Sequence, residues 1–253
     1  MKASGIVKLN LSSKYNKKEL EYRENIQQKE EEYDTFEKWC VRLQDGRVDY
    51  LKKIIKKLEF SGKILEIGAG SSWFSCQLSK LDSVEQVYCL DFSEKLMIEI
   101  VPKVMDLFKA NKNKMKRIVG DFYNLDFPEA SFDMVVVDAA LHHIDDMNTA
   151  LKEIKKVLKK DGRLVAIREP IIPLFRPSSR KNFGLHERSL GVTEKIYTKS
   201  EWTNFFEKSG FSIKFLSIIP EYNLKYKLIN LFPFSYLNGY LFAHYIFLAN
   251  KKL

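Results

Sequence analysis

The first regularity in the chain is an alternation of short apolar runs with segments whose apolar residues recur every three or four positions. Short apolar runs predict strands, and the three- or four-residue spacing predicts helices. The run Met134–Val137 is unbroken, which is typical of a strand buried on both faces of a parallel sheet. Up to residue 168, the predicted strands are 63–67, 87–91, 117–120, 132–138 and 163–168.

A helix is expected between the fourth and fifth of these strands. Residues 152–160 place Ile154, Val157 and Leu158 on one side, and Asp161-Gly162 supplies a glycine of the kind that ends helices. Alternating strands and helices predict an open, doubly wound α/β sheet with mostly parallel strands. In such sheets, ligands bind at the carboxyl ends of the strands.

Residues 1–60 are expected to form an N-terminal helical cap. Residues 1–12 are polar and lack periodicity, so we expect a loose terminus. Residues 14–58 have helical spacing that is interrupted near Asp45-Gly46. Such helices either cover a ligand or simply cover an edge of the sheet, and the spacing does not separate these alternatives.

Two more strands are predicted near the C-terminus, at 211–219 and 245–249, which gives a sheet of seven strands. They flank an unusually aromatic insertion, residues 220–243, before the last strand. This insertion would roof a substrate site, form a dimer contact or touch a membrane surface. Pro233 interrupts any long amphipathic helix, which weakens the membrane alternative.

The loop after the first predicted strand gives the clearest chemical signal. An apolar strand runs into Gly68-Ala69-Gly70, and Asp91 follows about 20 residues later. Glycines allow a tight turn and a close approach of the backbone to a ligand, and the acidic side chain would accept hydrogen bonds from a ribose. A dinucleotide-binding loop requires a small residue where this chain has Trp73. A nucleoside ligand without phosphates, such as S-adenosylmethionine, is therefore expected.

Four sequence blocks resemble class I S-adenosylmethionine-dependent methyltransferases. In order, they are ILEIGAGSSWFS, VYCLDFSEKLM, IVGDFYNLDFPEASFDMVVVDAALHHIDD and LKEIKKVLKKDGRLVAIREP. The resemblance extends approximately from Leu51 to Lys252. It implies a Rossmann-like fold, a methyltransferase core over residues 61–253, S-adenosyl-L-methionine as the cofactor, and N-terminal helices that usually cover it.

The resemblance also assigns the cofactor contacts. Glu66 is expected to hold the ammonium group of the cofactor and the neighbouring loop, and Asp91 to accept from the ribose hydroxyls. Asp121 is expected to accept from the adenine amine; its alternative role is that of a turn residue after a strand. The full set is Glu66, Gly68, Ala69, Gly70, Asp91, Phe92, Asp121, Phe122 and Asp138.

Two histidines follow the fourth predicted strand, where reacting groups lie in open α/β sheets. A histidine titrates near neutral pH and can accept a proton from a hydroxyl nucleophile. His143 matches the position of a recurrent histidine of the family, which is either structural or catalytic, and His142 is the alternative base. Glu169 and His186 are further candidates on sequence position alone.

The segment 169–200 is expected to bind the acceptor. Arginine forks match phosphate and carboxylate groups, so this basic segment predicts an anionic acceptor, the alternative being a solvated loop. The run HERSLGVTEKIYTKSEW resembles the tail of bacterial methyltransferases from surface-polysaccharide clusters, which implies a phosphorylated or nucleotide-linked sugar. The candidate residues are Arg168, Arg176, Arg180, His186 and Arg188, together with Lys181.

Missing motifs narrow the choice of acceptor. The segment Asp138-Ala139-Ala140-Leu141 stands where amino-methylating DNA enzymes carry Asp/Asn-Pro-Pro-aromatic, and no Pro-Cys pair is present for attack on a pyrimidine. The Lys and Tyr of metal-dependent catechol-type methyltransferases are also missing, so no metal is predicted. We expect O-methylation of a small acceptor, with RNA methylation or a non-catalytic cofactor-binding subunit as alternatives.

Composition changes this picture little. The net charge of +9 is spread over the 253 residues, which is typical of a solvated surface rather than a nucleic-acid patch. Cys40, Cys76 and Cys89 have neither paired nor metal-ligand spacing, and no signal peptide is recognised, which together indicate a reducing cytoplasm. No apolar run is long enough to span a bilayer, and a homodimer is left open.

Overall fold

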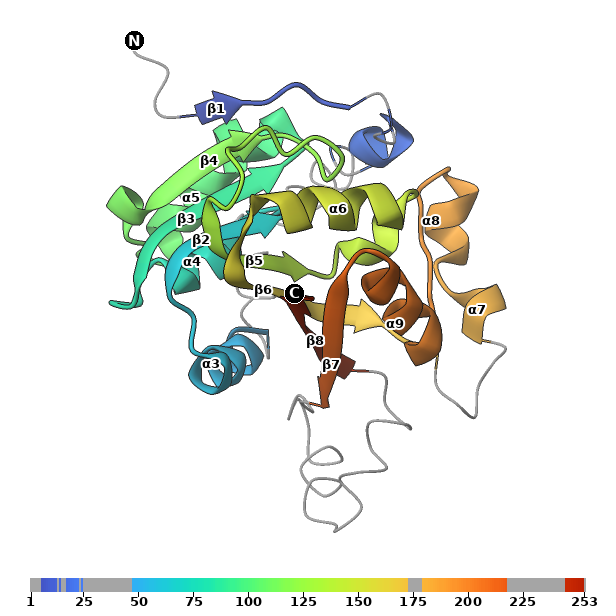
Figure 1. The fold of residues 1–253 in the computed structure, drawn as a ribbon. Helices are drawn as coiled ribbons and strands as arrows, with labels where there is room; N and C mark the ends of the chain where they lie inside the picture. Colours follow the sequence, from blue (N-terminus) through green and yellow to red (C-terminus); the bar gives the residue numbers. More distant parts are fainter. Residues whose placement is uncertain are drawn as a thin grey trace.

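The structure is a computed structural model that describes residues 6–12, 14, 17–22, 24, 47–172, 179–217 and 244–252. The strands of these ranges form one eight-stranded sheet in the order β1-β4-β3-β2-β5-β6-β8-β7 (Figure 1). Neighbouring strands are parallel except where β8 pairs with β6 and with β7. The predicted open, mostly parallel α/β sheet is confirmed.

The predicted strands are all present among the described residues, and 132–138 has the predicted bounds. The strands are β1 (Ile6–Lys8), β2 (Gly62–Ile67), β3 (Val84–Asp91), β4 (Met115–Val119), β5 (Phe132–Asp138), β6 (Leu158–Pro170), β7 (Phe211–Ser217) and β8 (His244–Lys251). The longer helices are α3 (Arg47–Leu58), α4 (Trp73–Leu78), α5 (Val101–Leu107), α6 (Met147–Val157) and α9 (Lys199–Lys208). Shorter turns are η1 (Leu96–Ile100), η2 (Lys112–Lys114), η3 (Leu141–His143), α7 (Ser179–Asn182) and α8 (Leu185–Ser189).

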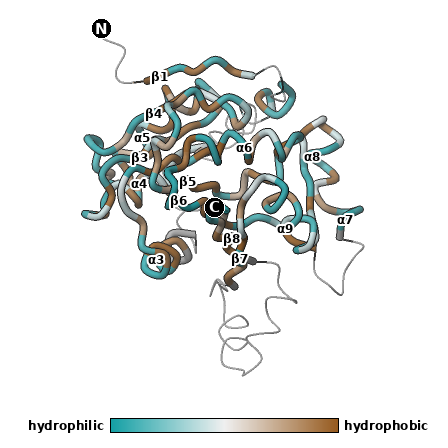
Figure 2. Tube along the Cα trace, in the orientation of Figure 1, coloured by the Kyte–Doolittle hydropathy of each residue, from teal (hydrophilic) through white to brown (hydrophobic). Residues whose placement is uncertain are grey.

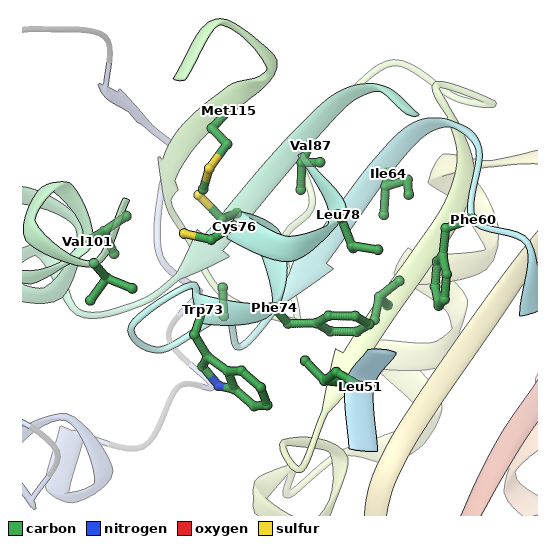
Figure 3. Packing of buried hydrophobic residues seen from close by; sticks show 14 of the residues in the cluster. Leu51, Phe60, Ile64, Trp73, Phe74, Cys76, Leu78, Val87, Val101 and Met115 are labelled. Carbon is green, nitrogen blue, oxygen red and sulfur yellow. The ribbon is translucent and has the colours of Figure 1, made fainter. Parts of the chain in front are cut away.

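Helices cover both faces of the sheet, so the middle parts of the central strands are mainly apolar (Figure 2). Ile64 of β2 packs with α3, α4 and α5 on one face, and Phe60 meets Phe74 edge to face at 5.8 Å between ring centres (Figure 3). Leu65, the next residue of β2, belongs to the second cluster, with α6 and α9 on the opposite face. This period-two alternation explains the unbroken apolar run of β5.

The sheet has eight strands rather than the predicted seven, because part of the expected loose terminus forms β1. Ile6 and Lys8 pair in parallel with Arg117 and Val119 of β4, and the N–H of Leu9 donates to the carbonyl of Val119 at 2.8 Å. Without β1, β4 would be an edge strand with unpaired backbone groups. The polar composition of the first residues conceals this pairing, since an edge strand is open to solvent.

The predicted end of the helix at residue 160 was also wrong, because α6 ends at Val157. Leu158 is extended, fully buried and paired with Phe132 of β5. Gly162 does not end the helix; it lies where a Cβ would come within 3.1 Å of the Asp133 carbonyl oxygen. The glycine therefore permits a close approach of β6 to β5.

Several sequence predictions concern residues outside the described ranges. In the expected N-terminal cap, α3 is confirmed and residues 17–22 are helical, while residues 25–46, including Cys40, lie outside. The aromatic insertion 220–243 and residues 173–178 of the acceptor segment also lie outside. Cys76 and Cys89 are buried free thiols, as predicted. Among the described residues, no helix is both long and apolar enough to cross a bilayer.

Candidate functional site

A cavity of about 480 Å³ lies at the carboxyl ends of β2, β3, β4 and β5. Its size is typical of a pocket for a small ligand or cofactor. The predicted site residues that line it are Glu66, Gly68, Ala69, Gly70, Asp91, Phe92, Asp121, Phe122, Asp138, His142, His143 and Arg168. The sequence therefore located the cavity, and which ligand atoms each residue contacts stays a prediction.

The glycine loop turns sharply between β2 and α4. Gly68 has a φ of 69°, and a Cβ there would lie 2.6 Å from the Cβ of Ala140. Gly70 has a φ of 52°, and apart from its chain neighbours no atom of the described residues lies within 4 Å of the corresponding Cβ position. Both conformations favour glycine, but only Gly68 is also enclosed by a neighbouring loop. The open side of Gly70 leaves space for a ligand against the backbone.

The carboxylate of Glu66 holds the start of α4. It accepts hydrogen bonds from the hydroxyl of Ser75 and, at 2.9 Å, from the Ser75 N–H. Burial raises the pKa of Glu66 to about 8; the bonds from Ser75 oppose this shift, and the negative charges of Asp138 and Asp91 add to it. A cationic ligand in the cavity would favour the ionised form, as expected of a group near the cofactor ammonium.

Asp91 connects the ends of two neighbouring strands. One carboxylate oxygen accepts from the N–H of Gly70 at 2.8 Å, and the other accepts from the N–H of Ser93 at 2.9 Å. Each carboxylate oxygen can accept a further hydrogen bond, so a ribose hydroxyl can still bind here. Asp91 is almost fully buried and lines the cavity.

Asp121 joins the cavity to the N-terminal segment. Its oxygens accept from the N–H of Tyr123 at 2.7 Å and from the N–H of Ser12 at 2.5 Å. The bond from Tyr123 closes a turn after β4, which is the alternative role of Asp121. The bond from Ser12 holds the segment after β1 across the end of β4. Phe122 and Tyr123 line the same part of the cavity.

Asp138 and Arg168 form a bidentate ion pair on the cavity wall. Nε and a terminal nitrogen of Arg168 donate to the two oxygens of Asp138 at 2.6 and 2.8 Å, and the guanidinium lies 5.6 Å from the ring centre of Trp73. Arg168 has a φ of 57° at a bulge of β6 against β8, and Ala139 has a φ of 52°. Such conformations in non-glycine residues are typical of functional sites.

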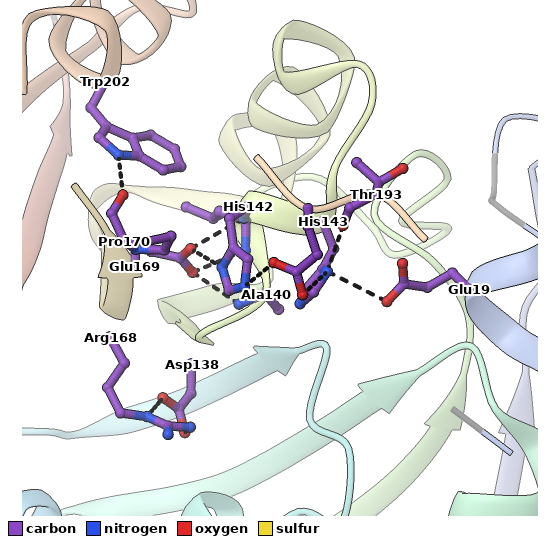
Figure 4. A network of polar contacts seen from close by, with 12 residues as sticks. Glu19, Asp138, Ala140, His142, His143, Arg168, Glu169, Pro170, Thr193 and Trp202 are labelled. Atoms are coloured by element: carbon purple, nitrogen blue, oxygen red, sulfur yellow. Dashed lines mark hydrogen bonds and ion pairs between the residues drawn. The ribbon is translucent and has the colours of Figure 1, made fainter. Parts of the chain in front are cut away.

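The two histidines after β5 lie against each other, with ring centres 4.1 Å apart and ring planes tilted by 41° (Figure 4). Nδ1 of His142 lies 2.8 Å from a Glu169 oxygen, and its Nε2 lies 3.7 Å from Glu194. Nδ1 of His143 lies 2.7 Å from the carbonyl oxygen of Thr193 and 3.7 Å from Glu194. We infer that Nδ1 carries the proton in both rings, because each faces an acceptor.

Glu169 is not a free base, because every bond that it makes holds the loop after β5. Its fully buried carboxylate accepts from the N–H groups of Ala140 and Leu141, both at 2.9 Å, and of His142 at 3.1 Å, besides Nδ1 of His142. It does not line the cavity. The sequence suggested a base on position alone, and the structure makes it the anchor of the histidine loop.

Sequence reasoning missed three acidic residues of the cavity wall, Glu19, Asp145 and Glu194. Glu19 lies in the N-terminal helical segment, with its carboxylate 3.5 Å from Nδ1 of His143. Glu194 lies between both histidines. Asp145 and Glu194 lie inside sequence runs that resemble methyltransferases, but those resemblances assign them no role. For Glu19 the only available signal was the expectation that N-terminal helices cover the cofactor.

The described arginines of the acceptor segment, Arg180 and Arg188, lie outside the cavity wall. Arg180 pairs with Glu201 at 2.5 Å, and both side chains are largely exposed. Arg188 donates to the carbonyl of Lys181 at 2.8 Å, and His186 is exposed on α8. None of the predicted acceptor residues Arg180, His186 and Arg188 lines the cavity, whereas Arg168 does. Arg176 lies outside the described residues.

The order of strands, the glycine loop and the acidic cavity define the class I S-adenosylmethionine-dependent methyltransferase fold. Residues 65–166 match the family model described as a methyltransferase domain. The chain therefore carries a methyltransferase domain, and the predictions of this class and of S-adenosylmethionine as its cofactor are confirmed.

Curated relatives point to the same domain. The chain is 29% identical over 167 residues to a demethylmenaquinone methyltransferase of Staphylococcus carnosus, covering 64% of this chain and 66% of the relative. A demethylmenaquinone methyltransferase of Staphylococcus epidermidis is 33% identical over 117 residues, covering 45% of this chain and 46% of the relative. The matched part thus spans about half to two thirds of the length of these relatives.

Solved structures share the fold. The YcgJ protein of Bacillus subtilis aligns with a TM-score of 0.60 and 19% identity, over 81% of this chain and 99% of that one. A phosphoethanolamine N-methyltransferase of Haemonchus contortus, in complex with phosphomonomethylethanolamine and S-adenosylhomocysteine, aligns with a TM-score of 0.58 and 17% identity. That alignment covers 81% of this chain and 53% of the other.

Proposed function

We propose that the protein transfers the methyl group of S-adenosylmethionine to a hydroxyl oxygen of a small acceptor, with sugar hydroxyls as one class. One observation carries this proposal: His142 and His143 share a cavity with the residues expected to bind the cofactor. Methyl transfer from a sulfonium is an in-line displacement, so the enzyme must align the acceptor oxygen and remove its proton.

The histidine loop is built to hold a base in place. Nδ1 of His142 faces Glu169 and Nδ1 of His143 faces the Thr193 carbonyl, so Nε2 is the nitrogen that would accept the proton in each ring. The carboxylate partner would stabilise the imidazolium of His142, as orienting carboxylates do in other nucleophile–base pairs. This favours His142 as strongly as His143, which the sequence placed first.

The charge of the cavity bears on the acceptor. Its acidic side chains suit the sulfonium and ammonium groups of the cofactor, and Arg168, the one arginine among the described residues of the wall, is bound to Asp138. The acidic residues are Glu19, Glu66, Asp91, Asp121, Asp138, Asp145 and Glu194. The wall therefore supports a neutral hydroxyl acceptor better than a phosphorylated one, and it disfavours a polyanion such as RNA.

The curated relatives favour a second candidate. Demethylmenaquinone methyltransferases are named for a quinone-type substrate, so an aromatic ring compound is an alternative acceptor for this chain. An electron-rich ring also needs a base near the reacting atom, and the two candidates use the same histidines. We also propose that the protein acts in the cytoplasm, because its cysteines show no disulfide-type spacing. A role in surface-polysaccharide synthesis is proposed from the run HERSLGVTEKIYTKSEW.

The test is an acceptor screen with methyl-labelled cofactor. Neutral sugars, sugar phosphates, phenols and quinols are offered to the wild-type protein and to His142→Ala and His143→Ala. If the substituted histidine is the base, the variant should react roughly 10²–10⁴ times more slowly and should keep its affinity for the cofactor. Binding of the cofactor without turnover of any class would favour a non-catalytic partner subunit.

The same screen tests the anionic acceptor. Arg180→Ala and Arg188→Ala remove the described arginines of the acceptor segment, and Arg176→Ala removes the remaining candidate. If anions bind there, the acceptor Michaelis constant should rise, most clearly at low salt, where attraction is least screened. Equal reaction of neutral and anionic acceptors, with wild-type behaviour of all three variants, would contradict an anionic acceptor.

A further inference from the structure

We propose that His142, His143 and Glu194 bind one divalent transition-metal ion beside the cofactor cavity. One ligand atom from each of these side chains lies within 4.8 Å of the other two. The three come from two separate segments, the loop after β5 and the loop after α8. The fold thus assembles two imidazoles and a carboxylate, which is a common donor set for such ions.

The measured separations are close to those of a loaded site. Nε2 of His142 lies 3.7 Å from one oxygen of Glu194, and Nδ1 of His143 lies 3.7 Å from the other. Bond lengths of about 2.0–2.2 Å to zinc place neighbouring tetrahedral ligands roughly 3.4 Å apart. Because the three ligand atoms lie within 4.8 Å of one another, the donors need to approach by at most about 1.4 Å, which side-chain rotation can supply.

The surroundings of His142 are those of a metal ligand. Histidine ligands commonly donate their second ring N–H to a carboxylate or a backbone carbonyl, which fixes the ring and its tautomer. Nδ1 of His142 lies 2.8 Å from the fully buried carboxylate of Glu169. Its Nε2 is thereby directed, unprotonated, toward Glu194.

His143 would change tautomer on binding. Its Nδ1 faces the Thr193 carbonyl at 2.7 Å and Glu19 at 3.5 Å (Figure 4). When Nδ1 ligates an ion, the single ring proton resides on Nε2, and the imidazole stays neutral. The Thr193 carbonyl oxygen would then lose its hydrogen bond to the ring, and the carboxylate of Glu19, 3.5 Å from Nδ1, is the candidate for a further ligand.

The donor set selects the kind of ion. Imidazole with carboxylate suits Zn²⁺, Co²⁺, Fe²⁺ or Mn²⁺, whereas Mg²⁺ and Ca²⁺ prefer oxygen alone. The site opens to the cavity, since all three side chains line it. An acceptor oxygen could therefore be a further ligand, and the ion would lower its pKa. With the ion bound, the two histidines would be ligands and not bases, so the ion would take over activation of the acceptor hydroxyl. Ion binding goes beyond the proposed methyl transfer and can be tested without it.

The experiment is a Co²⁺ titration of chelator-treated full-length protein, followed by the visible absorption of the bound ion. Saturation at one ion per chain is expected, with displacement by Zn²⁺ and none by Mg²⁺. His142→Ala and Glu194→Gln should each weaken binding by at least roughly tenfold. His186→Ala is the matched control, because it removes an exposed imidazole away from the cavity.

Far-UV circular dichroism and cooperative thermal unfolding, measured in parallel, show whether each variant is folded. Absence of a Co²⁺ spectrum in the wild type, or undiminished binding by a folded Glu194→Gln protein, would overturn the metal site. If His142→Ala does not fold, Glu194→Gln alone decides. Because the titration needs no acceptor, its failure leaves methyl transfer untested, and an inactive acceptor screen leaves the metal result standing.

Discussion

Arg168 and Asp138 join the ends of β6 and β5 through two hydrogen bonds of 2.6 and 2.8 Å. The sequence assigned the carboxylate to the cofactor and the arginine to the acceptor. In the structure, the two side chains neutralise each other on one wall of the cavity. This ion pair fixes the position of both side chains on the wall, and Trp73 lies under the guanidinium.

Removing this arginine should be costly, because the Asp138 carboxylate is only 4% exposed. Arg168→Met is expected to lower the free energy of unfolding by about 3 kcal/mol, the lower end for breaking a buried pair, since the arginine itself is partly exposed. Asp138→Asn in the same protein should recover part of the loss. Urea unfolding measures both.

The control for this pair is Arg180→Met, which breaks the exposed pair with Glu201. Exposed pairs contribute little, so its cost should stay below about 1 kcal/mol. Equal costs for the two arginines, or no recovery in the double variant, would show that the Asp138–Arg168 pair is not a buried unit.

The glycine loop provides a matched comparison of two positions. Gly68→Ala and Gly70→Ala both place a Cβ on a residue with positive φ, at a cost of roughly 1–2 kcal/mol each. Only Gly68→Ala also brings the new atom within 2.6 Å of the Ala140 Cβ. Thermal unfolding should therefore show the larger loss for Gly68→Ala. Equal losses would mean that the Ala140 loop moves away without cost.

Glu66 should make the ligand-free protein less stable as the pH rises. Its pKa is about 8 in the fold, against 4.5 for an ordinary glutamate. Between these values the folded protein holds more protons than the unfolded chain, so the stability that Glu66 contributes is complete below 4.5 and is lost as the pH rises through 8. The melting temperature should fall over this window.

Glu66→Gln removes the ionisation and should flatten that dependence, while Glu85→Gln, at an exposed position, should leave it unchanged. S-adenosylmethionine should also flatten it, because its positive charges favour the ionised carboxylate. A wild-type profile that is superimposable on that of Glu66→Gln would contradict the raised pKa.

Local sequence signals located the parts of the site that a single strand–loop–helix unit can build. Gly68, Gly70 and Asp91 are recognisable because turn conformation and strand-end position follow from neighbouring residues. Glu19 and Glu194 were missed, since chain segments far from the motif bring them to the cavity wall. The long-range pairing of β1 with β4 escaped prediction for the same reason.

The charge of a sequence segment predicted its function less well than the pattern of apolar residues predicted the fold. The basic acceptor segment predicted an anion site, yet Arg180 meets Glu201 and Arg188 meets a backbone carbonyl. Charged side chains on a surface commonly find partners of their own, and composition does not say which. By contrast, the segment Met134–Val137 predicted a buried strand correctly, because burial on both faces leaves no choice of residue type.

The most direct test of the cofactor site is calorimetric titration of the wild type, Asp91→Ala and the exposed control Asp82→Ala with S-adenosylmethionine. The wild type and the control should bind at one site per chain, with little affinity for NAD. Asp91→Ala should lose about 1–3 kcal/mol of binding free energy, the contribution of a hydrogen bond to a charged group. A folded wild type that binds no S-adenosylmethionine, or a folded Asp91→Ala protein that binds it equally well, would contradict a cofactor site in this cavity.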